Sequence, residues 1–320
     1  MQIAIVGTGV AGLSVAYHLH CQGLDVTLFD PKGIGGGASG ISTGLLHPFP
    51  GRQALRSWMA SEGMAASAKL LEIAAGALGR PVAESTGVLR SAVTEQQKND
   101  YQKRSLEDPE AVWLEAEQMW SRIPHAAPGL WIPSGKTVYS RRYLEGLFLA
   151  CPGIKLEKTA VRSLQELAGF DRIILATGFE TLQFPECAHL PLEPTKGHTL
   201  VCRWPERLPC SLVSLGHITP TEDPTLCQIG STYEHNFRSL EPDPKAIPLL
   251  LQKAARFYPP AKDFEVVELR AGVRISPKVG YHPLVMQLSP KVWLFTGLGS
   301  RGLLYHALLG EQLAYKIAKE

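Results

Sequence analysis

Three glycines and one aspartate near the N-terminus have the residue types and the spacing of a phosphate-binding turn. The glycines stand in the segment Gly7-Thr8-Gly9-Val10-Ala11-Gly12. The first permits a tight turn, the second lets a pyrophosphate approach the backbone, and the third lets a helix pack closely on a strand. Asp30 lies where a carboxylate accepts hydrogen bonds from an adenosine ribose, and an acid there disfavours a 2′-phosphate. These residues predict a dinucleotide site without separating FAD from NAD.

The elements that position these residues follow from the apolar pattern around them. Residues 2–6 are an apolar strand, residues from 10 onward have helical periodicity, and residues 25–29 form a second strand that ends at Asp30. The pyrophosphate would then lie at a helix N-terminus, where unpaired N–H groups and the helix dipole favour anions. Strand, turn, helix, second strand and acid therefore come in the order that a cofactor site requires.

A second glycine-rich segment, residues 33–40, follows the presumed ribose acid directly. Its sequence Gly33-Ile34-Gly35-Gly36-Gly37-Ala38-Ser39-Gly40 is too rich in glycine for the interior of a helix or a strand. A loop of small side chains with free N–H groups suits an extended FAD, whose second phosphate and ribityl chain need contacts that NAD does not. The alternative is a flexible linker on the surface.

The pairing of this first turn with Gly37-Ala38-Ser39-Gly40 and Gly44-Leu45-Leu46 resembles the FAD-dependent D-amino-acid oxidase superfamily, which includes glycine oxidase, sarcosine oxidase and D-amino-acid dehydrogenase. Leu175-Ala176-Thr177-Gly178 is similar to the strand and turn beside the cofactor in that family, and Pro194-Thr195-Lys196-Gly197-His198 resembles its proline-x-arginine-glycine-glutamine motif. Residues 270–274 and 297–303 resemble especially the FAD domain of the bifunctional tRNA 5-methylaminomethyl-2-thiouridine biosynthesis protein.

The resemblance implies that FAD is the cofactor and that it is bound non-covalently. The positions that attach the flavin in some relatives correspond to Ile41 and to a residue near Ser276, which cannot form the bond. A helix that begins at Gly302 would place a second helix N-terminus near the flavin, where its dipole stabilises the negative charge of the reduced ring. The candidate cofactor-binding residues are Gly7, Gly9, Val10, Ala11, Gly12, Asp30, Pro31, Gly37, Ala38, Ser39, Gly44, Leu45, Leu46, Val161, Ala176, Thr177, Gly178, Gly197, Arg274, Gly299, Ser300, Arg301, Gly302 and Leu303.

The chemistry that the resemblance implies is oxidation of a C–N bond by hydride transfer to flavin N5, followed by hydrolysis of the imine. Such a site needs little acid–base machinery but does need an anchor for a substrate carboxylate, and a guanidinium is the favoured solution. Arg274 corresponds to the arginine that binds the carboxylate in glycine oxidase; the alternative is a structural salt bridge. Arg301, in the loop before the last helix, approaches the flavin or else only enters the helix.

Four further residues are weaker candidates for the catalytic pocket. His47 follows the segment that runs along the flavin in the family, and the alternative is a hydrogen-bonded structural histidine. Tyr305 and His306, in the first turn of the last helix, either narrow the catalytic pocket or simply pack against neighbouring side chains. Tyr233 ends a strand of the substrate domain. Residues 279–283 lack the acid that the family has there, so substrate specificity does not transfer from any one relative.

The element pattern predicts an α/β fold with a Rossmann-type FAD-binding domain built on a parallel sheet and an α+β substrate domain built on a mainly antiparallel sheet. The predicted FAD-binding domain comprises residues 1–52, 136–194 and 284–320, and the predicted substrate domain comprises residues 53–135 and 195–283. Predicted helices are residues 53–78, 94–106, 141–151, 244–257 and 302–320. Predicted strands beyond the first two lie near residues 87–89 and over 154–163, 172–176, 199–203, 211–215, 225–231, 265–275 and 292–296.

Composition limits the other classes of function. The 32 Lys and Arg residues nearly balance the 30 Asp and Glu residues, which does not indicate nucleic acid. The ten histidines show no His-x-x-x-His spacing and the six cysteines no Cys-x-x-Cys pair, so we expect no metal. No stretch of about 18 apolar residues could span a bilayer. The first strand begins at residue 2, so we expect no cleaved leader and a cytoplasmic location.

These observations predict an FAD-dependent oxidoreductase that acts on a small amino acid or a carboxylate-bearing secondary amine, with oxygen or a quinone as electron acceptor. One alternative is a stand-alone tRNA-modifying oxidoreductase that acts on the carboxymethylaminomethyl group of a wobble uridine; tRNA is thus a possible but less favoured partner. The other alternative is a flavin-binding scaffold without turnover.

Overall fold

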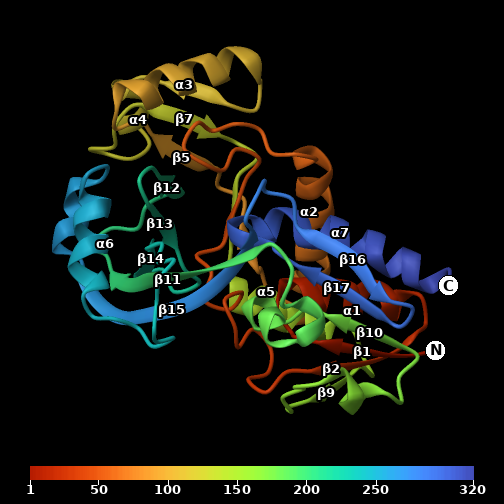
Figure 1. The fold of residues 1–320 in the computed structure, drawn as a ribbon. Coiled ribbons are helices and arrows are strands. Elements are labelled where there is room, and N and C mark those ends of the chain that lie inside the picture. Colours follow the sequence, from red (N-terminus) through yellow and green to blue (C-terminus); the bar gives the residue numbers. More distant parts are fainter.

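A computed structural model describes all of residues 1–320 and contains three β-sheets of six, eight and three strands. Figure 1 shows the six-stranded and eight-stranded sheets in different parts of the molecule, with β11 and β15 reaching from one toward the other. The α-helices are α1 (Val10–Cys21), α2 (Ala60–Leu78), α3 (Glu95–Glu107), α4 (Ala116–Trp120), α5 (Ser140–Leu149), α6 (Ala246–Ala255) and α7 (Gly302–Ala318). Short 3-10 helices are η1 (Leu164–Leu167), η2 (Gly178–Gln183), η3 (Pro185–Cys187), η4 (Pro259–Asp263) and η5 (Gly299–Arg301).

The six-stranded sheet holds the N-terminus and has the order β16-β17-β10-β1-β2-β9. Its strands are β1 (Gln2–Val6), β2 (Asp25–Phe29), β9 (Lys155–Glu157), β10 (Arg172–Leu175), β16 (Leu284–Ser289) and β17 (Val292–Thr296). Five strands run parallel, and only β16, at the edge, is antiparallel to its neighbour. The central strands are buried on both faces, which explains why they are apolar throughout rather than alternating.

Helices α1, α2, α5 and α7 pack with one face of this sheet in the largest apolar core of the protein. Helices α1 and α7 approach closely because Gly310 faces Ser14, and the Ser14 hydroxyl donates to the carbonyl oxygen of His306 at 2.9 Å. A smaller apolar core on β1, β10 and β17 includes Leu192 and Ile275. The ends of β11 and β15 are therefore anchored beside the parallel sheet.

The eight-stranded sheet has the order β15-β11-β14-β13-β12-β5-β7-β6 and is antiparallel except where β5 meets β12. Its strands are β5 (Val88–Ser91), β6 (Val112–Leu114), β7 (Gly129–Ile132), β11 (Leu192–Arg203), β12 (Ser211–Val213), β13 (His217–Pro220), β14 (Leu226–Gly230) and β15 (Glu265–Pro277). Helix α6 packs on β11 and β14. The third sheet pairs β3 (Leu45–Leu46) and β4 (Ala83–Glu84) with β8 (Lys136–Val138).

This architecture confirms the predicted combination of a parallel sheet with helices and a mainly antiparallel sheet. The domain boundaries stay a prediction. Residues 88–132 and 192–277 contribute all the strands of the eight-stranded sheet. Helix α2, which falls within the predicted substrate domain, places Leu70, Leu71 and Ala74 in the same core as α1, α5 and α7. Helix α2 therefore packs with the helices of the parallel sheet and not with the eight-stranded sheet.

Three predicted elements are wrong in extent. The helix expected from residue 53 begins only at Ala60, because Ala54 and Met59 have left-handed backbone conformations, with φ of 48° and 45°, that a right-handed helix cannot contain. The strand expected over residues 154–163 shortens to β9, because its neighbour β2 ends at Phe29 and offers no further pairing. The strand expected over residues 199–203 is the last part of β11, which begins at Leu192. The α-helices and strands that were not predicted are α4 and strands β3, β4, β6, β7, β8, β13 and β16.

Candidate cofactor and substrate site

The glycine turn after β1 has the close backbone contacts that the sequence pattern predicts. Gly7 has φ of +105°, and a Cβ there would lie 2.3 Å from the carbonyl oxygen of Ala176 at the end of β10. A Cβ on Gly12 would lie 1.9 Å from the carbonyl oxygen of Gly7. Both positions therefore exclude any side chain. At Gly9 a Cβ would meet only the Ser39 hydroxyl, at 2.8 Å, so this position faces the glycine-rich loop rather than the backbone of the sheet.

The N-terminus of α1 has the features of an anion site. Its capping residue, Gly9, has no side chain to cap the helix, and the first turn contains no acidic residue. The Val10 N–H donates to the Ser39 hydroxyl at 3.2 Å, so residues 33–40 lie against this helix end. The partial positive charge of a helix N-terminus is thus not compensated by a carboxylate. The residues present fit the pyrophosphate of FAD.

The glycine-rich loop is tied to the first turn by hydrogen bonds. The Thr8 hydroxyl donates to the Gly33 carbonyl at 2.9 Å, and the Gly35 N–H donates to the Thr8 carbonyl at 3.2 Å. Gly33 and Gly35 have φ of +72° and +66°, a conformation that favours glycine. These bonds favour a built cofactor loop over a surface linker.

Asp30 is oriented by two backbone donors and by the Thr8 hydroxyl, whose single proton it shares with the Gly33 carbonyl. Its carboxylate accepts from the Thr8 N–H and the Thr8 hydroxyl, both at 3.0 Å, and from the Lys32 N–H at 2.9 Å. A carboxylate has about four lone-pair sites, so this half-buried group keeps capacity for a ribose hydroxyl. Pro31, which follows it, is exposed.

Segments that are distant in the sequence converge beside this cradle. A Cβ on Gly272 in β15 would lie 2.5 Å from Ile41 and 3.4 Å from the backbone of Ala38, and a Cβ on Gly299 would lie 2.5 Å from the Ser276 hydroxyl. Gly302, at the start of α7, lies beside Val10, since a Cβ there would be 3.5 Å from its side chain. Ligands of open α/β sheets bind outside the carboxyl ends of the strands, which is where these segments meet.

The remaining predicted cofactor residues have different surroundings. Thr177 follows β10, and its hydroxyl lies 2.9 Å from that of Thr181, while the Gly178 carbonyl accepts from Thr296 at 3.4 Å. Leu45 and Leu46 form β3, and Gly44 precedes it with φ of +78°. Ala11 and Leu303 are buried, Gly37 and Ser300 are exposed, and Val161 packs against the apolar core on β1, β10 and β17. Gly197, in β11, faces Arg274 and Thr232.

Arg274 lies in β15 and forms no salt bridge, since no carboxylate is within 4.0 Å of it. Its Nη2 donates a long hydrogen bond of 3.4 Å to the Thr232 carbonyl, and its Cζ lies 4.6 Å from the centroid of the Tyr233 ring. Desolvation acts to raise the pKa of Tyr233, but Arg274, Ser231 and Lys253 together lower it. The guanidinium is therefore not consumed by an acid of the protein, as the salt-bridge alternative would require.

Two histidines are held neutral, and one of them, His217, lies near this cation. His47 is buried, and its Nδ1 accepts from the Phe49 N–H at 3.2 Å; desolvation, with Arg90 and His217 nearby, lowers its pKa to about 3. His217 has Nε2 2.8 Å from the Thr43 hydroxyl, and desolvation with the charges of Arg274 and Lys253 lowers its pKa to about 3 as well. His217 was not predicted. Its partner Thr43 precedes the predicted segment 44–46, but no local signal links it to residue 217.

The two candidates in the first turn of α7 differ. Both ring nitrogens of His306 have protein partners, with Nδ1 3.0 Å from the Gly302 carbonyl and Nε2 2.6 Å from the Tyr143 hydroxyl. This geometry favours the packing alternative for His306. Tyr305 is fully buried, yet its hydroxyl has no hydrogen-bond partner, and its ring lies 5.9 Å from that of Trp58. The fold thus leaves the Tyr305 hydroxyl without a protein partner, and its place in the pocket stays a prediction.

Arg301, like Arg274, forms no salt bridge. Its Cζ lies 4.2 Å from the centroid of the exposed Tyr281 ring, in the segment 279–283 that departs from the family pattern. The contact orders a half-buried guanidinium at the N-terminus of α7. Arg301 therefore contacts a side chain of the protein, and its approach to the flavin stays a prediction.

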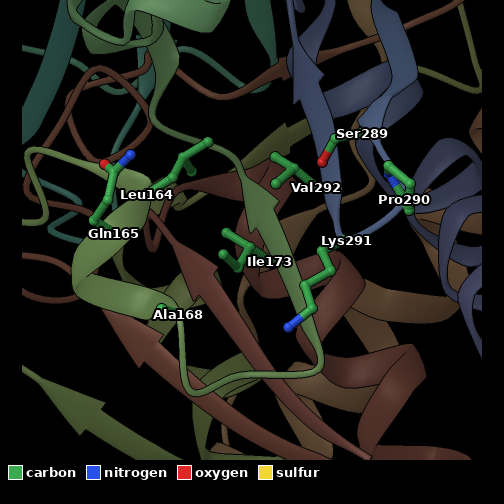
Figure 2. Close-up of a pocket in the computed structure, with 8 residues that line it drawn as sticks. All are labelled: Leu164, Gln165, Ala168, Ile173, Ser289, Pro290, Lys291 and Val292. Atoms are coloured by element: carbon green, nitrogen blue, oxygen red, sulfur yellow. The ribbon is translucent and has the colours of Figure 1, made fainter.

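A separate surface pocket lies at the opposite end of the parallel sheet. Figure 2 shows its lining from η1, the start of β10 and the turn between β16 and β17. This is the amino-terminal end of the parallel strands, away from the glycine turn, so the pocket is not part of the candidate site. No three His, Cys, Asp or Glu side chains are grouped as metal ligands. None of the helices is long and apolar enough to cross a bilayer.

Comparison with known proteins agrees with this geometry. Over 364 aligned residues the chain is 26% identical to the tRNA 5-methylaminomethyl-2-thiouridine biosynthesis bifunctional protein of Marinobacter nauticus, covering 99% of this chain and 56% of that protein. The chain thus spans little more than half the length of such relatives. It is 25% identical to glycine oxidase of Pseudomonas putida, covering 85% and 82% of the two chains.

Solved structures show the same fold. Glycine oxidase from Geobacillus kaustophilus superposes with a TM-score of 0.87 at 21% identity, covering 100% of this chain and 95% of that one. Iminodiacetate oxidase from Chelativorans sp. superposes with a TM-score of 0.82 at 21% identity, covering 99% and 95%. The family model for FAD dependent oxidoreductases matches residues 2–316. This match confirms the predicted superfamily and FAD as the cofactor, and the chain belongs to the DAO family of FAD-dependent oxidoreductases.

Proposed function

We propose that this protein oxidises the C–N bond of a small amino acid or of a secondary amine that carries a carboxylate. The observation that carries the proposal is Arg274, a half-buried guanidinium with no acidic partner, held beside Tyr233 where β15 passes the loop of residues 38–41. A planar guanidinium binds a carboxylate through two parallel hydrogen bonds, which fixes the orientation of the ligand as well as its position.

The chemistry that bound FAD would supply is acceptance of a hydride from the substrate, with oxygen or a quinone as the final electron acceptor. The residues of the chain then have to bind and orient the amine. Arg274 holds its carboxylate, and the orphaned hydroxyl of Tyr305 can donate to a ligand or accept from it. His47 and His217, each with a pKa of about 3, are too weakly basic to take a proton from an ammonium group. In this proposal the amine arrives as the free base, and orientation supplies most of the rate.

The names of two similar proteins support a small substrate. One relative is a glycine oxidase and one similar structure is an iminodiacetate oxidase. The near balance of charge over the chain also favours a small molecule over a polyanion. We retain the predicted cytoplasmic location and non-covalent FAD as parts of this proposal.

The second candidate is oxidation of the carboxymethylaminomethyl group of a tRNA wobble uridine. It is supported by relatives with that role in their names, which match 97–99% of this chain at 24–26% identity. The chain spans 56–58% of those proteins, so their activity cannot be transferred whole. A scaffold without turnover would bind FAD but leave it oxidised in the presence of every amine.

Anaerobic reduction of the purified holoprotein tests these possibilities. The panel contains glycine, sarcosine, proline and D-amino acids, with tRNA bearing the carboxymethylaminomethyl uridine as a separate arm. We expect a small carboxylate-bearing amine to bleach the flavin absorbance near neutral to alkaline pH. Bleaching by the modified tRNA alone would select the second candidate. If no amine and no tRNA bleaches the flavin, the remaining alternative is a flavin-binding scaffold without turnover.

A further inference from the structure

A second cation, Lys253, lies beside the proposed carboxylate anchor. It belongs to α6, and its Nζ donates to the carbonyl oxygen of Ser231 at 3.0 Å. Arg274 lies in β15, an edge strand of the eight-stranded sheet, and donates to the carbonyl oxygen of the next residue, Thr232. Two cations from different elements are thus fixed by adjacent carbonyls of the segment that follows β14.

Both cations also contact one aromatic ring. The Lys253 Nζ is 5.6 Å, and the Arg274 Cζ 4.6 Å, from the centroid of the Tyr233 ring. The two charges therefore cannot be farther apart than the sum of these distances, a span that a small molecule can bridge. Desolvation lowers the pKa of Lys253, and the charges of Arg274 and Arg52 act in the same direction.

The protein supplies no anion to compensate these charges. Lys253, Arg274 and Arg52 all lie more than 4.0 Å from every carboxylate, although the chain forms twelve such pairs elsewhere. Two like charges held together without a counterion destabilise the folded state. Their arrangement is therefore not explained by the stability of the fold.

A buried polar atom at the same place independently indicates a ligand. Ser231 is only 5% exposed, and its hydroxyl has no partner with hydrogen-bond geometry, although it lies near enough to Tyr233 to help lower the pKa of that side chain. An unpaired buried hydroxyl destabilises the folded state unless something binds it. It belongs to the residue whose carbonyl accepts the hydrogen bond from Lys253.

We propose that Lys253 and Arg274 together bind a substrate with two anionic groups, so that the preferred amine carries a carboxylate on each side of the nitrogen, as an imino-dicarboxylate does. Arg274 binds the carboxylate next to the carbon that is oxidised, and Lys253 binds the second one, with the Ser231 hydroxyl as a further donor. This inference rests on the proposed amine oxidation and assigns its substrate class. It makes Lys253 a specificity residue, not a catalytic one.

The test compares a dicarboxylate with a monocarboxylate amine in the same holoenzyme. Rates of anaerobic flavin reduction are measured with iminodiacetate and with sarcosine, for the native protein and for Lys253→Gln, Lys253→Met and Lys253→Arg. We expect the native protein to prefer iminodiacetate. The ratio of the two efficiencies should fall about 10- to 100-fold in the Gln and Met variants, as expected for the loss of one charged hydrogen bond, and should largely survive in the Arg variant.

Lys262→Gln is the matched control, because Lys262 is an exposed lysine on η4, outside this cluster; its ratio should stay native. FAD content and thermal unfolding show whether each variant is folded. A native protein without preference for iminodiacetate overturns the proposal whatever the variants do. A folded Lys253→Gln variant with the native ratio overturns it as well.

A binding arm separates this inference from the proposed function. Malonate and acetate, which cannot be oxidised here, are titrated into the holoprotein while the visible flavin spectrum is followed. Malonate that binds native protein at least tenfold more tightly than Lys253→Gln, with no amine reducing the flavin, supports the two-cation site and rejects the oxidation. A different outcome is that Lys253→Gln leaves malonate binding unchanged and lowers only the reduction by modified tRNA. In that case the two cations bind nucleic-acid phosphates, and the proposal of a small dicarboxylate substrate is rejected.

Discussion

The Val10 N–H donates to the Ser39 hydroxyl at 3.2 Å, which joins the first turn of α1 to a loop 29 residues further along the chain. The bond places the glycine-rich loop over a helix N-terminus that has neither a capping side chain nor an acid in its first turn. Backbone donors and a hydroxyl are thus collected where a pyrophosphate would bind. The same geometry explains why Gly9 has to remain small.

Gly9→Leu should abolish FAD binding without unfolding the protein. Its Cβ would lie 2.8 Å from the Ser39 hydroxyl, and the rest of the side chain would fill the space that the pyrophosphate needs. The measurement is the visible absorbance of the purified variant and the FAD released on heat denaturation. Gly76→Leu is the control, because Gly76 is exposed on α2 with open space at its Cβ. A yellow Gly9→Leu protein with full FAD would place the phosphate elsewhere.

Gly12→Ala should destabilise the fold itself. The new Cβ would lie 1.9 Å from the Gly7 carbonyl oxygen, which is backbone and cannot move without separating α1 from β1. We expect a loss of about 1–3 kcal/mol or more in the free energy of unfolding, the usual cost of overpacking. Urea denaturation of the apoprotein measures it. Gly76→Ala, in the interior of α2, should instead gain about 0.5–1 kcal/mol, and an equal response of the two variants would contradict the close helix contact.

Arg274→Ala should lower the efficiency of flavin reduction while FAD content stays native. Truncating one member of a buried charge pair costs about 2–5 kcal/mol, which corresponds to roughly 30- to several-thousand-fold. Arg274→Lys should rescue only part of this loss, because an ammonium lacks the planar fork of donors. Stopped-flow reduction by the best amine of the panel measures both. Near-native kinetics in the alanine variant would move the anchor to Arg301.

Tyr143→Phe should reduce stability more than catalysis. The change removes the hydroxyl that lies 2.6 Å from His306 Nε2 and leaves a fully buried imidazole nitrogen unpaired. The expected cost is about 1–3 kcal/mol in the free energy of unfolding. Reduction kinetics at a temperature where the variant is folded should stay within a few-fold of native. A large fall in the reduction rate with unchanged stability would return His306 to the active site.

The stability of the protein should fall as the pH drops below about 6.5. His47 and His217 have pKa values lowered to about 3 in the folded state, mainly by desolvation, whereas both titrate near 6.5 when unfolded. Between these values the unfolded chain binds more protons, so stability is fully present above the unfolded pKa and is lost as the pH falls toward 3.

Each such histidine contributes a slope of at most about 1.4 kcal/mol per pH unit in this window. Urea unfolding at a series of pH values from 4 to 8 measures the slope, and His47→Gln should make it shallower. His189→Gln, at an exposed position, should leave it unchanged. Equal slopes in the native protein and in His47→Gln would show that the pKa of His47 does not differ between the folded and the unfolded state.

The parts of this protein that the sequence determined by itself are those governed by local rules. The turn from β1 to α1 follows from three glycines and an apolar run within residues 2–21, and the closing strand and helix follow from residues 292–318 in the same way. The motif order along the whole chain was enough to predict the family and FAD. The same local rules misplaced the start of α2, because an Ala-rich periodic segment does not reveal two residues with left-handed backbone conformations.

Only the tertiary structure decided which polar side chains are free to act. Arg274 and His306 are both pocket candidates in the sequence, the second a weaker one, but folding leaves the first without a carboxylate partner and pairs the second with Tyr143, 163 residues away. The neighbourhood of Lys253, Ser231 and Tyr233 exists because α6 packs across β14 onto the segment that follows it. The physical reason is that a charge or a hydroxyl takes its role from which atoms satisfy it, and those atoms come from distant parts of the chain.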